Sequence, residues 1–184
     1  MRPLPLIVLC FVLAGAGCSD SNGLPDPTFE NIERTDTLWA LVGTPVSTPS
    51  GYALDGGRRI RTDLSVEFDF AYNIENEGRH VFLPRAALGI DTANAVNPGL
   101  QPRDESFEAI TSAPGDGYIT DEPVPIAVGQ RYVARSRVTC ALGVPKYGKL
   151  EIIELDEVTR MVAFRVLIND NCGFRSLEPG LPDR

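Results

Sequence analysis

The sequence of 184 residues contains only one histidine, His80. Catalytic triads and metal clusters that need two histidine side chains are therefore excluded. The chain also lacks the Gly-x-Ser-x-Gly, Ser-x-x-Lys, His-Glu-x-x-His and Walker signatures of common catalytic sites. His80 follows a charged turn and precedes Val81 and Phe82, where we expect it to be a surface or packing residue. These absences predict that the protein is not an enzyme.

One catalytic class needs no histidine, namely hydrolases that use two carboxylates. The chain has 25 Asp and Glu residues, but no motif selects a pair among them. We therefore assign no catalytic residue, no cofactor and no metal site, and keep a carboxylate-dependent hydrolase as the least favoured alternative.

A long apolar run is also missing. The run Leu4 to Leu13 covers about ten residues, whereas a helix that spans a membrane needs roughly 20. It follows the positive charge of Arg2 and precedes the small residues 14–17. This order predicts a secretory signal peptide over residues 1–17.

The residues that follow this run suggest a lipid anchor. Gly17-Cys18 resembles the processing site of bacterial lipoprotein precursors, in which small residues precede a cysteine that receives a diacylglyceryl group. Gly15 departs from that pattern, because the family usually has an aliphatic residue there. The resemblance implies lipid attachment at Cys18, and Ser19 implies an outer membrane lipoprotein that faces the periplasm. Ala14-Gly15-Ala16 also fits ordinary signal cleavage, so the alternative is a soluble periplasmic or secreted protein.

Only four cysteines are present, and Cys10 would be removed with the signal. Cys140 continues the alternating apolar pattern of residues 132–138, and Cys172 continues that of residues 162–168. Because they lack the Cys-x-x-Cys spacing of metal and redox pairs, they predict a structural disulfide. Such a bridge closes a loop of about 30 residues and would stabilise the fold by roughly 3–4 kcal/mol.

Positively charged residues are fewer than negatively charged ones, and the formal net charge is −8. Acidic proteins are repelled by phosphate-rich surfaces, which argues against nucleic acid partners and against electrostatic membrane binding. Residues 18–35 are rich in Ser, Asp, Asn and Pro, and predict a flexible tether after the lipidated cysteine, although Phe29 and Ile32 could dock. We expect residues 36–184 to form a single β-rich domain.

Helical periodicity is almost absent, and only residues 84–88 and 104–111 are compatible with a turn or two of helix. The clearest strand is Leu64 to Ile74, in which alternation predicts a core face and a solvent face that includes Asp69 and Ala71. Turn residues 75–78 and a return strand over 79–83 follow. Further strands are predicted over residues 38–42, 58–62, 124–128, 132–140, 150–155 and 161–169. Short strands without long crossovers predict an all-β antiparallel β-sandwich, with a small β-barrel as the alternative.

Three binding features remain. Arg131, Arg135 and Arg137 share one face of a predicted strand and could bind a partner protein or a glycan, or could pair with acids such as Glu67 and Asp69. Trp39 and Tyr72 could form a sugar platform, although their strand patterns favour the core. The stretch from Asp116 to Glu122 gathers carboxylates, but its spacing differs from that of a calcium-binding EF-hand loop.

The segments Thr37 to Leu41 and Asn171 to Arg175 loosely resemble uncharacterised bacterial lipoproteins, which implies a location and no activity. We therefore expect an exported, lipid-anchored binding or accessory protein of the cell envelope, serving as a scaffold in a protein assembly. The alternative is a carbohydrate- or small-ligand-binding module.

Overall fold

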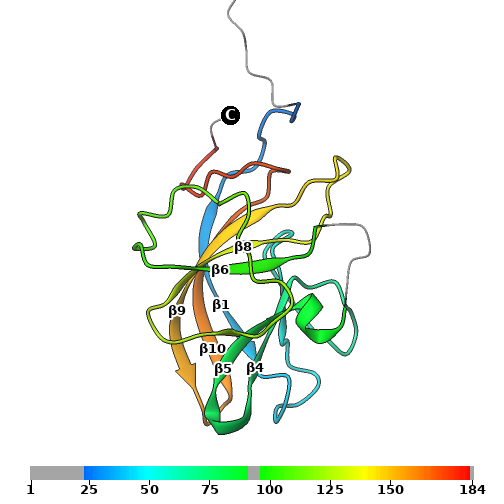
Figure 1. Ribbon diagram of the computed structural model, residues 1–184, viewed down its shortest axis with the longest axis vertical. Coiled ribbons are helices and arrows are strands. Elements are labelled where there is room, and N and C mark those ends of the chain that lie inside the picture. The colour runs from blue at the N-terminus through cyan, green and yellow to red at the C-terminus, as the bar shows by residue number, and fades with distance from the viewer. Residues whose placement is uncertain (1–22, 91–95, 183–184) are drawn as a thin grey trace, which may run out of the picture.

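The computed structural model describes residues 23–90 and 96–182. The predicted signal peptide and Cys18 lie outside the described residues. The described chain forms two antiparallel five-stranded sheets, which are not closed into a barrel (Figure 1). The predicted β-sandwich is thus confirmed.

The first sheet has the strand order β1-β10-β9-β8-β6 and the second has the order β3-β2-β4-β5-β7. The strands of the first sheet are β1 (Ile32–Trp39), β6 (Gly99–Arg103), β8 (Arg131–Arg135), β9 (Tyr147–Asp156) and β10 (Met161–Asn169). The strands of the second sheet are β2 (Gly51–Ala53), β3 (Arg58–Ile60), β4 (Phe70–Ile74), β5 (His80–Pro84) and β7 (Val124–Pro125). Two short 3-10 turns, η1 (Asn76–Gly78) and η2 (Arg85–Leu88), flank β5.

The main core lies between the sheets and has an aromatic centre. Phe164 of β10 meets Tyr52 edge-on, with 5.1 Å between ring centroids, and meets Phe82 at 6.0 Å. The ring centroids of Phe70 and Phe82 are 4.8 Å apart. These side chains come from both sheets and occupy the alternating inward positions of their strands.

The predicted strand over residues 64–74 is wrong in its first half. Strand β4 begins at Phe70, and Val66 is 54% exposed. The predicted solvent face is also wrong, because Asp69 is only 1% exposed and Ala71 is fully buried. The outer face of the second sheet is covered by the preceding segment, where Phe68 packs directly against Gly51.

A second apolar cluster lies on the outer face of the first sheet. It is formed by Phe107, Ile110, Ala113, Val133, Tyr147, Leu167 and Leu177. This face is covered by residues 104–118 and 174–180, which form no helix and no extended strand. Alternation within single strands cannot reveal such a cover, because the covering segments have no strand or helix period of their own.

The folded unit extends ahead of the predicted domain boundary at residue 36. The backbone N–H groups of Thr28 and Phe29 donate to Asn171 Oδ1 at 2.8 and 3.0 Å, and Asn31 pairs with Gly180. The side chain of Phe29 nevertheless remains 58% exposed. Part of the segment predicted as a tether is therefore docked through its backbone.

The predicted disulfide between Cys140 and Cys172 is present, with 6.0 Å between the Cα atoms. Strand β8 ends at Arg135, so Cys140 lies in the following loop and not in the strand that we predicted over residues 132–140. The bridge joins the β8–β9 loop to the segment after β10.

The two ends of the sandwich differ in what they contain. Both ends of the described chain lie at one end, which we call the terminal end (top of Figure 1). Because β1 and β10 are antiparallel and Trp39 pairs with Met161, the β9–β10 turn lies at the opposite end, together with the β4–β5 hairpin. We call this the distal end. Among the described residues, no helix is long and apolar enough to cross a membrane.

Candidate functional site

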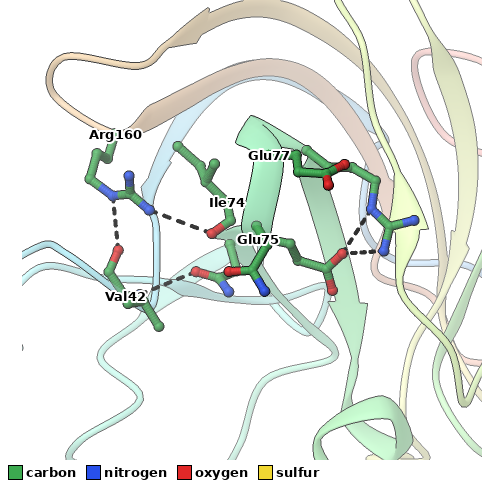
Figure 2. A pocket seen from close by; sticks show the side chains of 8 residues that line it. Val42, Ile74, Glu75, Glu77 and Arg160 are labelled. Atoms are coloured by element: carbon green, nitrogen blue, oxygen red, sulfur yellow. Dashed lines mark hydrogen bonds and ion pairs between the residues drawn. The ribbon is translucent and has the colours of Figure 1, made fainter.

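An open hollow of about 850 Å³ lies at the distal end (Figure 2). Its walls come from the β1–β2 loop, the β4–β5 hairpin and the β9–β10 turn. It is lined by Val42, Asn73, Ile74, Glu75, Asn76, Glu77, Arg79 and Arg160. Small-molecule sites usually have volumes of roughly 300–1,000 Å³, so the hollow has a suitable size for a ligand.

Arg160 forms one wall and is held by two backbone carbonyls. Its Nε donates to Val42 O at 2.9 Å and its Nη2 to Ile74 O at 3.5 Å. The Val42 N–H in turn donates to Asn73 Oδ1 at 3.2 Å. Gly43 is required beside the guanidinium, because a Cβ there would lie 2.7 Å from Arg160 Nε. The guanidinium is thus fixed in position while Nη1 has no hydrogen-bond partner among the described residues.

The opposite wall carries acidic groups, as Figure 2 shows for Glu75 and Glu77 on the other side of Ile74 from Arg160. Glu75 is engaged, because Arg79 Nε donates to its Oε2 at 2.8 Å and the Nη2 group makes a second contact. No hydrogen bond or ion pair engages the Glu77 carboxylate within the described part of the chain. The hollow therefore presents one anchored cation and one unpaired anion.

Both of these residues have unusual backbone conformations. Glu77 has φ = 64° and Arg160 has φ = 55°, and in residues 23–90 and 96–182 they are the only non-glycine residues with positive φ. This left-handed region costs an L-residue with a Cβ roughly 1–2 kcal/mol, and Gly or Asn usually occupies it. Backbone strain of this kind clusters at functional sites.

Of the three arginines predicted as a binding row, only Arg131 and Arg135 lie on strand β8. Arg131 Nε donates to Glu151 Oε1 on the neighbouring strand at 3.0 Å. Arg135 donates to Asn97 O at 2.9 Å, and its guanidinium lies 4.5 Å from the centre of the Tyr118 ring. Both side chains thus have contacts within the molecule.

Arg137 lies beyond the end of β8 and turns toward the second sheet. Its backbone N–H donates to Asp69 Oδ1 at 2.7 Å, its guanidinium lies 3.5 Å from the same oxygen, and Glu67 lies at 3.9 Å. Leu54 N–H donates to the other Asp69 oxygen at 2.7 Å. Burial raises the pKa of the Asp69 carboxyl, and the donors from Arg137 and Leu54 offset part of this effect. This pairing with Glu67 and Asp69 is the structural alternative named above.

His80 has a packing role. Its Nδ1 lies 2.6 Å from the Tyr72 hydroxyl, and its Nε2 lies 3.9 Å from Glu157 in the β9–β10 turn. Tyr72 is fully buried, and burial raises the pKa of its hydroxyl, which therefore stays protonated.

The structure does not bring Trp39 and Tyr72 together as a sugar platform. Tyr72 is inside the core, whereas Trp39 is half-buried and follows the core residue Leu38 on β1, so it points to the other face of the sheet. Between Asp116 and Glu122 the carboxylates are exposed, and no group of three or more potential metal ligands occurs among the described residues.

Sequence reasoning identified residues 75–78 only as a turn and did not single out Arg160. The sequence signal that could have identified them is that each hairpin turn has a charged residue, Glu77 or Arg160, at a position where Gly or Asn is favoured. The distance in sequence between the two turns hid their proximity.

Comparison with known protein families, with characterised proteins and with solved structures finds no match.

Proposed function

We propose that this chain is an exported binding protein of the cell envelope, anchored by a lipid at Cys18 to the outer membrane and facing the periplasm. In this proposal it acts without catalysis, as an accessory or scaffold in a protein assembly. The observation that carries the proposal is the pairing of Cys140 with Cys172. Disulfides persist in oxidising compartments such as the periplasm.

The cysteine inventory supports the anchor. Cys10 falls within the proposed signal, and the disulfide accounts for two further cysteines. Cys18 is then the one remaining thiol of the mature chain, and lipid attachment gives it a role. It also follows small residues, as in the lipoprotein precursors that it resembles.

The short distance in sequence between Cys18 and the folded domain supports a domain that stays near a bilayer. The side chain of Leu24 already lies against Gly173, and Thr28 is bound to Asn171, so only about six residues separate Cys18 from the part of the chain held to the domain. Six residues reach at most roughly 20 Å when fully extended. The terminal end would then face the bilayer, and the distal end would be accessible from the periplasm.

The anchor is tested by intact mass and membrane fractionation of the wild-type protein and of a Cys18→Ser variant. We expect the wild type to carry diacylglyceryl mass, to begin at residue 18 and to sediment with outer membranes. Cys18→Ser should lose all three properties, whereas Cys10→Ser, a matched control within the signal, should keep them. An unmodified wild-type protein that still begins at Met1 would overturn the envelope proposal.

The scaffold role is tested by mild cross-linking in native envelopes, followed by purification through a C-terminal tag and mass spectrometry. A partner that is cross-linked reproducibly by the wild type, and is lost when Cys18→Ser removes the protein from the membrane, supports an assembly role. Recovery of the protein without any partner rejects the scaffold role.

The second candidate is a small-ligand-binding module, and the hollow at the distal end favours it. The hollow has an anchored guanidinium, an unpaired carboxylate and a volume suited to a small molecule. This candidate requires neither lipid attachment nor a protein partner.

A further inference from the structure

We infer that the distal hollow binds a zwitterionic ligand that carries both an ammonium and a carboxylate group, such as a short peptide with free ends. The inference deepens the small-ligand candidate of the proposed function. It does not depend on lipid attachment at Cys18.

The carboxylate of the ligand would bind Arg160. This guanidinium is positioned before any ligand arrives, because Val42 O and Ile74 O accept hydrogen bonds from it. Its remaining N–H donors include those of Nη1. A fixed guanidinium binds carboxylates well, because its planar donors match the two carboxylate oxygens and little side-chain freedom is lost.

The ammonium of the ligand would bind Glu77. Glu75 and Arg79 neutralise each other through their ion pair. The charges that remain on the lining are therefore one carboxylate, on Glu77, and one guanidinium, on Arg160. A ligand with a single charge would satisfy only one of them, whereas a zwitterion satisfies both.

The backbone conformations point to the same two residues. Asn or Gly would relieve the left-handed strain at both positions, yet the chain has charged side chains there. Arg160 also holds the β1–β2 loop, which gives it a structural reason to be present. Glu77 has no partner within the described residues, so its carboxylate is available to a molecule outside the chain.

The size and accessibility of the hollow agree with a peptide ligand. An extended tripeptide spans about 10 Å, which an open hollow between two hairpins can accommodate. Asn73 and Asn76 also line the hollow and offer amide groups to a peptide backbone.

The test is an NMR titration of the purified full-length protein with trialanine, N-acetyl-trialanine and trialanine amide, following the backbone amides of residues 76–78 and 160. We expect saturable shifts with trialanine at a Kd of about 1 mM, a value typical of a small and exposed contact. Removal of either end charge should weaken binding about fivefold, the upper range for an exposed ion pair. The absence of saturable shifts up to about 10 mM, roughly tenfold above this Kd, would overturn the inference.

Binding that depends on only one of the two end charges would also overturn it, since the hollow would then be an anion or a cation site. N-acetyl-trialanine and trialanine amide distinguish these two results.

Two variants and one matched control assign the binding to the named side chains. Glu77→Asn suits the left-handed backbone, so it should melt at a temperature no lower than the wild type and still lose about fivefold in trialanine affinity. Glu122→Asn removes an exposed carboxylate outside the hollow and should bind as the wild type does. Unchanged affinity in Glu77→Asn would contradict the inference. Arg160→Lys keeps the charge and removes the planar fork, so it should also bind trialanine more weakly.

Failure of this test and failure of the envelope proposal are distinguishable. A protein without lipid that binds trialanine would reject the anchor and retain the hollow as a site. A lipidated protein that does not bind trialanine would do the reverse.

Discussion

Individual charged residues in this protein have very different surroundings. Glu77 is exposed and unpaired on a strained backbone, whereas Lys146 and Asp55 form a half-buried ion pair. The energetic role of each follows from its surroundings and not from its residue type.

Glu77→Asn should raise the free energy of unfolding by about 1 kcal/mol, because Asn adopts the left-handed conformation at a lower energetic cost than Glu. Urea denaturation of the variant and of the wild type measures this difference. Glu122→Asn should leave stability unchanged within roughly 0.5 kcal/mol, as for most surface substitutions. A destabilised Glu77→Asn variant would show that the carboxylate supports the fold.

Lys146 should make stability depend on pH at both extremes. Its Nζ donates to Asp55 Oδ1 and Asp170 Oδ1, each at 2.6 Å. The hydrogen bond from Lys146 lowers the pKa of Asp55, and the hydrogen bonds to Asp170 and Asp55 outweigh burial and raise the pKa of Lys146.

The sign of each effect follows from these directions. The contribution of Asp55 is present above its unfolded pKa of about 3.9 and is lost as pH falls through the lower folded value. The contribution of Lys146 is present below its unfolded pKa of about 10.4 and is lost as pH rises through the higher folded value. Lys146→Met should therefore lower the free energy of unfolding by about 1 kcal/mol across the neutral range, and by progressively less at both extremes of pH. Urea denaturation of the variant and of the wild type at a series of pH values measures this difference. A difference from the wild type that does not change with pH would assign the loss to packing instead.

At the scale of elements, the first sheet depends on irregular segments that cover its outer face. Val133, Lys149 and Leu167 are paired across β8, β9 and β10, and lie beneath residues 104–118. Lys149 is almost fully buried, and its Nζ donates to Phe107 O at 2.7 Å and to Ile110 O at 2.9 Å. The side chain thus joins the cover to the sheet, and burial lowers the pKa of its ammonium group.

Lys149→Met should keep the packing of the aliphatic chain and leave both carbonyl groups without their donor. We expect a loss of about 1–3 kcal/mol, the usual cost of unsatisfied buried polar groups. Hydrogen exchange should accelerate most in residues 106–113. Glu154→Gln, at an exposed position of the same strand, is the control and should leave exchange unchanged. Equal exchange in Lys149→Met and the wild type would show that apolar contacts suffice to hold the cover.

At the scale of the whole molecule, the terminal end is held by bonds between segments far apart in the sequence. The disulfide joins residues separated by 32 positions, and Asn171 binds the backbone of Thr28 and Phe29. The distal end is held by turns and by Arg160. In the proposed function, the terminal end would serve attachment and the distal end would serve binding.

Replacement of both Cys140 and Cys172 by Ser should lower the free energy of unfolding by roughly 3–4 kcal/mol. Without the bridge, the unfolded chain has more conformational entropy. Urea denaturation with and without reductant measures the loss. The double variant should show no further effect of reductant. Alkylation of both cysteines under denaturing, non-reducing conditions would contradict the disulfide itself.

The sequence by itself determined the fold class, the disulfide and the strand β10, which was predicted with its observed bounds. These features depend on period-two alternation and on cysteine phase, which are local properties of the chain. The short strands β2 and β6 were missed, because each begins with Gly and β6 also contains Pro102, and both residue types weaken a strand pattern.

Only the tertiary structure decided what lies on the faces and ends of the sandwich. Asp69 was predicted to face solvent and Lys149 belongs to a residue type that is seldom buried, yet both are buried by segments that have no periodicity of their own. Glu77 and Arg160 are 83 positions apart, and only the folding of two hairpins to the same end of the sandwich places both on one hollow. Alternation along a strand states which side chains share a face, but the packing of distant segments decides whether that face meets water, protein or ligand.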